Sequence, residues 1–238
     1  MTEHTVSAFD TELSSLRSTV VEMGGFAEKM VEDATRALVR RDPDLAQTII
    51  AADIRLDNLQ REVEERAILT IARRQPMAVD LREIVSAIRV AGDIERIGDL
   101  AKNIAKRTVA IGNQFQPPKI VVGVQHMSDL VQEQLKDVLD GYTQHDADVA
   151  LAVWNRDGDI DALYTSLFRE LLTYMMEDPR NIGFCTHLLF SAKNIERIGD
   201  HTTNIAETIN YLVTGETLGP ERPKADKSSF TTVDIAKS

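Results

Sequence analysis

Acidic residues spaced four apart are the residues of this chain best suited to chemistry. Four such pairs are Asp53/Asp57, Glu95/Asp99, Asp157/Asp161 and Glu196/Asp200. Residues four apart share one face of a helix, so each pair presents two neighbouring carboxylates. Like charges at this spacing destabilise a helix by roughly 0.2–0.5 kcal/mol per pair, which solvation or a bound cation would offset. Oxygen-rich clusters suit Mg²⁺, Ca²⁺ or Mn²⁺, and also iron at carboxylate-bridged sites.

Other reactive motifs are missing from the sequence. It contains no glycine-rich phosphate loop, no HExxH and no GxSxG. The stretch that begins at Asp157 resembles an EF-hand loop, but its sixth position is Ala162 and its twelfth is Phe168, where Gly and Glu are required. No histidine, lysine or other non-carboxylate group is placed at the same position beside the acidic pairs of both halves, where it could act as acid or base. We therefore expect no catalytic residues and a protein that is not an enzyme.

The two halves of the chain repeat each other. The segment AGDIERIGDLAKNIAKR at 91–107 matches AKNIERIGDHTTNIAET at 192–208 at ten of seventeen positions. Upstream, Asp42, Asp53 and Asp57 recur as Asp146, Asp157 and Asp161. Two differences stand out: Asp93 is replaced by Asn194, and Leu100 by His201. Each half therefore carries two acidic pairs, and the two sites need not have equal affinity.

Prolines and capping residues divide the chain into long helical segments. Asp42, Asp146 and Asp178 are typical N-caps, and two of them precede a proline. The six expected helices cover about 8–40, 43–73, 77–112, 119–144, 146–176 and 180–213. Short links between long helices imply antiparallel neighbours. The sequence predicts an all-α fold of two tandem, related three-helix bundles, or else one continuous six-helix bundle.

This division gives three expected regions: a first bundle over 1–114, a second over 115–215, and a loosely ordered tail over 216–238. In the third helix, apolar residues repeat along one stripe: Ala87, Val90, Ala91, Ile94, Ile97, Ala101 and Ile104. Glu95 and Asp99 lie beside that stripe. Gly98 and Gly199 lie inside expected helices, where alanine would be more stable. Glycine at such positions indicates close approach of another helix or of a ligand.

Composition limits the class of protein. The 238 residues carry a formal net charge of −11, which excludes the overall basic footprint of a nucleic-acid-binding domain. The single cysteine, Cys185, excludes an internal disulfide framework. No signal peptide is visible, and the apolar runs are far shorter than the roughly 20 residues that cross a bilayer. We expect a cytoplasmic protein with no nucleic-acid partner and no direct membrane insertion.

Several segments together resemble the PhoU family of bacterial phosphate-transport accessory proteins. They are Met23-Gly24-Gly25, RRQPMAVDLREI at 73–84, the two IERIGD copies, and TYMMED at 173–178. Their order, spacing and duplication agree with the family over roughly residues 8–214. The resemblance implies two similar three-helix bundles, a homodimer, and a cytoplasmic protein held at the inner face of the membrane through its partners.

The resemblance also implies a function. PhoU proteins link the phosphate ABC transporter, through its nucleotide-binding subunit, to the phosphate-sensing histidine kinase, and keep the starvation response off. Family members bind metal clusters through E(D)xxxD motifs. Carried over to this chain, the metal ligands are Asp53, Asp57, Glu95, Asp99, Asp157, Asp161, Glu196 and Asp200. The metal is a divalent or iron-type ion of open identity.

Three hypotheses follow from the sequence. The first is a regulatory adaptor that works by protein contact. The second is an enzyme with a carboxylate-bridged metal site. The third is a bundle that stores metal or uses it only for stability.

Overall fold

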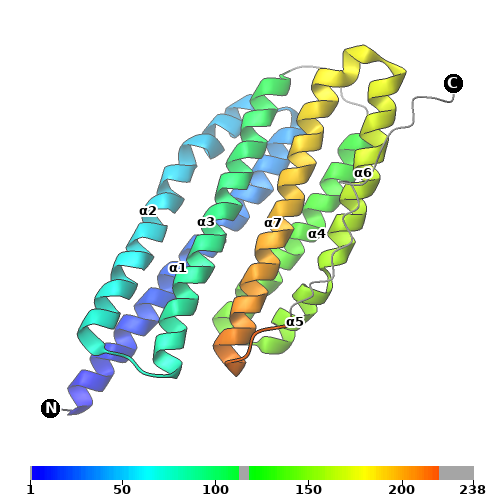
Figure 1. Ribbon diagram of the computed structural model, residues 1–238. Coiled ribbons are helices and arrows are strands. Elements are labelled where there is room, and N and C mark those ends of the chain that lie inside the picture. Colours follow the sequence, from blue (N-terminus) through cyan, green and yellow to red (C-terminus); the bar gives the residue numbers. More distant parts are fainter. Residues whose placement is uncertain (1, 113–117, 220–238) are drawn as a thin grey trace.

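The computed structural model describes residues 2–112 and 118–219, and all regular structure in these ranges is helical (Figure 1). The elements are α1 (Thr2–Arg40), α2 (Pro43–Arg74), α3 (Val79–Ile111), α4 (Pro118–Gln144), α5 (Ala147–Asn155), α6 (Asp157–Glu177), the short 3-10 helix η1 (Pro179–Asn181) and α7 (Ile182–Thr214). The all-α prediction is confirmed. The expected boundary between residues 114 and 115 lies outside the described residues, as does the tail from residue 220.

Two three-helix bundles stand side by side (Figure 1). In the first, α1, α2 and α3 pack against one another, and in the second α4 and the α5–α6 segment pack against α7. Helices α3 and α7 run antiparallel along the centre and form the main junction between the halves, while α1 also contacts α4. The prediction of two tandem bundles is confirmed, and they share one continuous core through this junction.

The expected single helix over 146–176 is wrong, because it is divided at Arg156. This residue has φ −89° and ψ 0°, outside the helical range. The Gln134 side-chain amide of α4 donates to the Arg156 carbonyl at 3.3 Å, and the Arg156 guanidinium pairs with Asp137. Ala52 occupies the corresponding position in the first half, where α2 continues unbroken. Contacts from α4 to both the backbone carbonyl and the side chain of Arg156 thus account for the division.

The predicted caps are confirmed. The Asp42 carboxylate accepts the Leu45 N–H at 2.9 Å, and the Asp146 carboxylate accepts the N–H groups of Asp148 and Val149 at 2.9 and 3.1 Å. Asp178 accepts the N–H of Arg180 at 3.0 Å and begins η1, which leads into α7. Each cap satisfies backbone donors that would otherwise lack partners. An N-cap of this kind typically contributes about 1 kcal/mol to the free energy of unfolding.

The predicted apolar stripe of α3 is buried along its length. Its members, each at most 1% exposed, are Ala87, Val90, Ala91, Ile94, Ile97, Ala101 and Ile104. Helix α3 lies at the junction of the two bundles, so it packs against α1 and α2 of its own bundle and against α7 of the other. The core therefore fixes α3 in rotation, and with it the positions of Glu95 and Asp99.

The mid-helix glycines mark places of close helix approach. A Cβ at Gly98 would lie 2.2 Å from Leu56 Cδ2 of α2, and a Cβ at Gly199 would lie 2.9 Å from Ile160 Cδ1 of α6. Leu56 and Ile160 occupy equivalent places in the two halves. Of the two readings that the sequence left open, helix packing is the one found.

Alanine at Gly98 should therefore destabilise the protein, by about 1–3 kcal/mol, because fully buried Leu56 must move. A Cβ at Gly92 on the same helix would meet nothing within 4 Å. Alanine there should therefore raise the free energy of unfolding by about 0.5–1 kcal/mol through its higher helix propensity. Urea unfolding followed by circular dichroism compares the two. Equal stability of both variants would contradict the close approach.

Candidate functional site

The carboxylates of the first half lie beside a close approach of α2 and α3. Leu56 packs at Gly98, so the residues flanking this contact on the two helices face one another. Burial raises the pKa of Glu95 above its ordinary value, and the nearby charges of Asp99, Asp57 and Asp53 raise it further. The predicted pairs of α2 and α3 are thus brought together into one acidic cluster, which we call the first cluster.

A lysine lies inside the first cluster. Lys102 Nζ is 2.5 Å from Asp53 Oδ2 on α2 and 2.5 Å from Asp99 Oδ1 on α3. Burial opposes the ammonium charge, but the hydrogen bonds to both carboxylates outweigh it and raise the pKa of Lys102. Sequence reasoning missed this residue because the second repeat has Thr203 in its place. Its spacing of three from Asp99 was the available signal.

The second cluster consists of Asp157, Asp161, Glu196 and Asp200, and its first three residues are 4–5% exposed. The Thr203 hydroxyl donates to Asp157 Oδ1 at 2.9 Å. Lys193 Nζ lies 2.8 Å from Glu196 Oε1. Within the described chain, Glu196 Oε2 is buried and accepts no hydrogen bond.

Burial also raises the pKa of Glu196. Lys193 opposes that rise through its hydrogen bond and charge, whereas the charges of Asp200 and Asp161 add to it. A buried carboxylate with one oxygen unsatisfied is costly, because its charge is removed from water without full compensation.

The donor chemistry fits an oxygen-preferring cation, because every predicted ligand is a carboxylate and one buried oxygen has no hydrogen bond. The geometry is less complete. Over residues 2–112 and 118–219, no three His, Cys, Asp or Glu side chains gather closely enough to hold a metal ion. Asp53 and Asp99 converge on an ammonium instead. Metal binding by the eight predicted residues stays a prediction.

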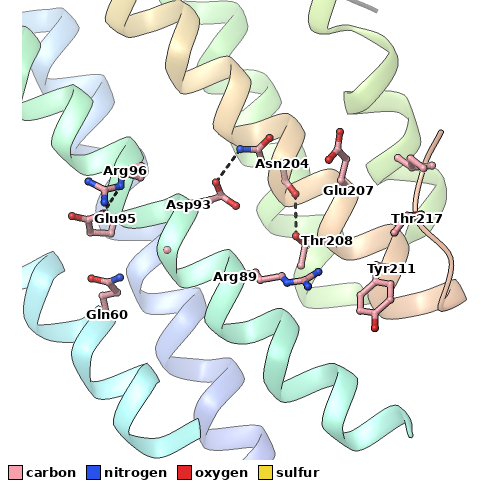
Figure 2. Close-up of a pocket in the computed structure, with 12 residues that line it drawn as sticks. Gln60, Arg89, Asp93, Glu95, Arg96, Asn204, Glu207, Thr208, Tyr211 and Thr217 are labelled. Carbon is pink, nitrogen blue, oxygen red and sulfur yellow. Dashed lines mark hydrogen bonds and ion pairs between the residues drawn. The ribbon is translucent and has the colours of Figure 1, made fainter. Parts of the chain in front are cut away.

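A groove of about 460 Å³ runs along the junction between α3 and α7 (Figure 2). Glu95 of the first cluster lies on its wall, beside Arg96 and opposite Asn204 and Glu207 of α7. The Trp154 indole N–H donates to Glu207 at 3.1 Å, which fixes that carboxylate. The first cluster is thus open to solvent on the side that faces the second half.

Two of the positions at which the repeats differ, 93 and 201, meet in this junction. Asp93 Oδ1 lies 2.8 Å from His201 Nδ1 and accepts the Asn204 side-chain amide at 3.1 Å. The repeat has Asn194 in place of Asp93 and Leu100 in place of His201. Both substitutions therefore serve one contact, which ties α3 to α7 on one side of the junction.

Comparison with known proteins agrees with the duplication. The sequence model of the PhoU domain family matches the chain twice, over residues 20–108 and 124–209.

The chain belongs to the PhoU family.

Each PhoU domain of the chain contains one acidic cluster. The chain is 58% identical over 226 residues to a phosphate-specific transport system accessory protein PhoU homolog of Rhizobium meliloti (strain 1021), covering 95% of both chains. It is 53% identical to a protein of the same description from Caulobacter vibrioides, over 95% of this chain and 98% of that one.

Solved PhoU structures share the architecture. The crystal structure of PhoU from Pseudomonas aeruginosa superposes with a TM-score of 0.85 at 41% identity, over 87% of this chain and all of that one. The phosphate transport system regulatory protein PhoU from Streptococcus pneumoniae gives 0.82 at 29% identity, over 89% and 99%. None of the described helices combines the length and apolar character needed to cross a membrane.

Replacing Glu196 with glutamine should raise the melting temperature at pH 7. A carboxyl whose pKa is raised on folding costs stability above its folded pKa, and the cost disappears below the unfolded value of 4.5. Glutamine removes that cost, and its carbonyl can still accept from Lys193. The gain should therefore be present at neutral pH and fade as pH falls towards about 4.

Thermal melts of Glu196→Gln from pH 4 to 7 measure this. The exposed Glu65→Gln substitution on α2 is the matched control. A lower melting temperature at pH 7 would mean that the Lys193 pair outweighs burial.

Proposed function

We propose that this chain is a regulatory adaptor of phosphate uptake, not an enzyme. It links the nucleotide-binding subunit of the phosphate ABC transporter to the phosphate-sensing histidine kinase and keeps the starvation response off when phosphate is abundant. The observation that carries the proposal is the 58% identity, over 95% of both chains, to a protein named as a phosphate-specific transport accessory protein. The second solved relative is named as a regulatory protein of the same system.

In this proposal the protein is a cytoplasmic homodimer, held at the inner face of the membrane by its partners. An adaptor changes a partner only by binding its states with unequal affinity. Long helices that pack over their whole length supply rigid surfaces for such discrimination. The junction between α3 and α7, with its Asp93–His201 pair, would hold the outer surfaces of the two bundles in a fixed relative position.

The same proposal gives the acidic clusters a role. A divalent or iron-type cation held by Asp53, Asp57, Glu95 and Asp99, or by Asp157, Asp161, Glu196 and Asp200, would tie neighbouring helices of each bundle together. What supports this is the gathering of buried carboxylates in both clusters: burial raises the pKa of Glu95 and of Glu196, and the charges of the neighbouring carboxylates raise both further. In this proposal the cation braces the bundle and takes no part in turnover.

A reporter assay tests the adaptor role. Deleting the gene should switch on a phosphate-starvation promoter in phosphate-rich medium, and the wild-type gene should silence it again. The Glu95→Gln/Asp99→Asn double variant should fold, because these residues flank the buried stripe, and complementation with it asks whether the first cluster is needed for signalling. Glu62→Gln/Glu65→Gln on α2 removes two charges elsewhere and should complement fully. A promoter that stays silent after deletion would contradict the regulatory role.

Metal binding has a separate test that does not involve signalling. A ligand that binds only the native state stabilises it, by about 2.7 kcal/mol at one hundred times its dissociation constant. Thermal melts with added Mn²⁺, and with a chelator, should therefore differ for the wild type. The shift should shrink in Glu196→Gln/Asp200→Asn. An unchanged melting temperature at millimolar Mn²⁺ would argue against the metal sites.

A further inference from the structure

Acidic residues are absent from two segments that the fold brings together. None of the 38 Asp and Glu residues lies between positions 100 and 128 or between positions 179 and 195. These segments include the C-terminal part of α3, the beginning of α4 and the first part of α7, which lie at the same end of the molecule (Figure 1). In a chain of net charge −11, this end of the junction between α3 and α7 therefore differs in charge from the rest.

At this end of the junction an arginine of α3 covers an aromatic ring of α7. The Arg107 guanidinium lies 4.5 Å from the centroid of the Phe190 ring, and its Nη1 lies 3.5 Å from His187 Nδ1. Burial and the charge of Arg107 lower the pKa of His187, so the imidazole is neutral at pH 7. Phe190 is still 48% exposed. The guanidinium and the ring together present an oriented positive charge beside an apolar surface.

The repeat-related surface at the other end of the junction is the groove, and it is acidic where this surface is not. Asp93 on the groove wall corresponds to Asn194 here, and Glu207 corresponds to Lys106. Lys106 is exposed. The same surface of the two halves thus carries carboxylates in one place and an amide and an ammonium in the other.

Arg197 adds a second guanidinium to this surface. It follows Phe190 by seven residues, so both lie on one face of α7, and its side chain is exposed. Its repeat counterpart, Arg96, lies 3.4 Å from oxygens of both Glu95 and Asp99. By contrast, Arg197 forms no ion pair with a carboxylate of residues 2–112 and 118–219, and neither does Arg107.

We propose that this surface docks an acidic segment of a partner protein, with Phe190 as the apolar anchor. We call it the basic face, and it consists of Lys106, Arg107, Phe190, Asn194 and Arg197. The inference rests on the proposed adaptor role and adds the chemistry of one partner and the place where it binds.

The side chains of the basic face suit a protein partner. Arginine and aromatic residues dominate the energetic centres of protein interfaces, and guanidinium groups match carboxylates with two parallel hydrogen bonds. A lipid surface fits less well, because Phe190 is the only large apolar side chain of the face, whereas binding to a membrane surface needs a continuous apolar face. Glu196, the nearest carboxylate in sequence, is 5% exposed and pairs with Lys193, so it does not oppose an acidic partner from the surface.

The position of the basic face gives it a role in regulation. Lys106 and Arg107 belong to the first bundle, whereas Phe190 and Arg197 belong to the second. A segment bound here contacts both bundles at once, so its affinity depends on how α3 lies against α7. Because the chain as a whole is negative, repulsion elsewhere and attraction here also steer an acidic partner to this face.

Binding of the full-length protein to the purified nucleotide-binding subunit, and to the cytoplasmic part of the kinase, tests the inference when measured at two salt concentrations. Arg107→Gln/Arg197→Gln should weaken binding to one of the two by about tenfold or more and reduce its salt dependence. Arg55→Gln/Arg61→Gln, on the exposed face of α2, is the matched control. Arg55 also lies over a phenylalanine ring, that of Phe26 at 4.8 Å, and this variant should bind as the wild type does.

Two further variants keep the result decisive. Lys106→Glu/Arg197→Glu changes only exposed residues and leaves the Arg107 contact in place, so a loss of binding there supports the inference even if the first variant folds poorly. Phe190→Ala should weaken binding without changing its salt dependence, because it removes apolar contact and no charge. Circular dichroism melts verify that each variant is folded.

The outcomes separate the inference from the proposal beneath it. If the wild type binds a partner and the variants of the basic face bind it equally well, the inference is wrong and the adaptor role stands. If the wild type binds neither partner, the adaptor role is itself wrong and the inference falls with it. If the variants instead lose self-association in sedimentation, or lose binding to phosphatidylglycerol vesicles, with partner binding unchanged, the face belongs to a second copy or to lipid and the inference is wrong.

Discussion

The close approach of two helix pairs is the constraint on which the rest of the structure depends. At Gly98 and Gly199 the missing side chain gives room to Leu56 and to Ile160. The residues that flank each contact are the acidic pairs, so the packing that brings the helices together also forces their carboxylates together. Apolar contact supplies the favourable free energy, and charge repulsion is the cost that accompanies it.

That cost is met differently in the two halves. In the first cluster an ammonium from α3 is held between Asp53 and Asp99, whereas in the second the Thr203 hydroxyl donates to Asp157 and the Lys193 ammonium pairs with Glu196. The same backbone arrangement therefore carries two different charge distributions. The Asp93–His201 pair continues this divergence into the junction, where one side of an approximately symmetric contact has become polar and ionisable. The two halves thus share a scaffold and differ in how charge is distributed over it.

The sequence predicted what depends on local pattern. The helix ends follow from Asp42 and Asp146, whose carboxylates accept backbone N–H groups in their own first turns. The stripe of α3 follows from its period. The break at Arg156 could not be predicted, because it is held by Gln134 and Asp137 of another helix, whose register against α5 no local signal reveals.

The same limit applies to the candidate site. The acidic pairs were evident because both members lie on one helix and recur in the repeat. Lys102 was missed, because its importance comes from a carboxylate 49 residues away on α2. The differences at residues 93 and 201 were noticed in the sequence, but only the fold shows that these two side chains face one another. Properties of one helix could be predicted, whereas pairings between helices required the structure.

A protein under selection for stability alone would not need to keep acids at these contacts. Glu196 is 5% exposed with one oxygen unsatisfied, and glutamine or an apolar side chain would cost less at that depth. The buried charge makes these contacts sensitive to nearby cations, such as the Lys193 ammonium 2.8 Å from Glu196 and the Lys102 ammonium between Asp53 and Asp99. The apolar stripe of α3 therefore holds the fold together, whereas the carboxylates at the contacts between helices add a cost that depends on the charges around them.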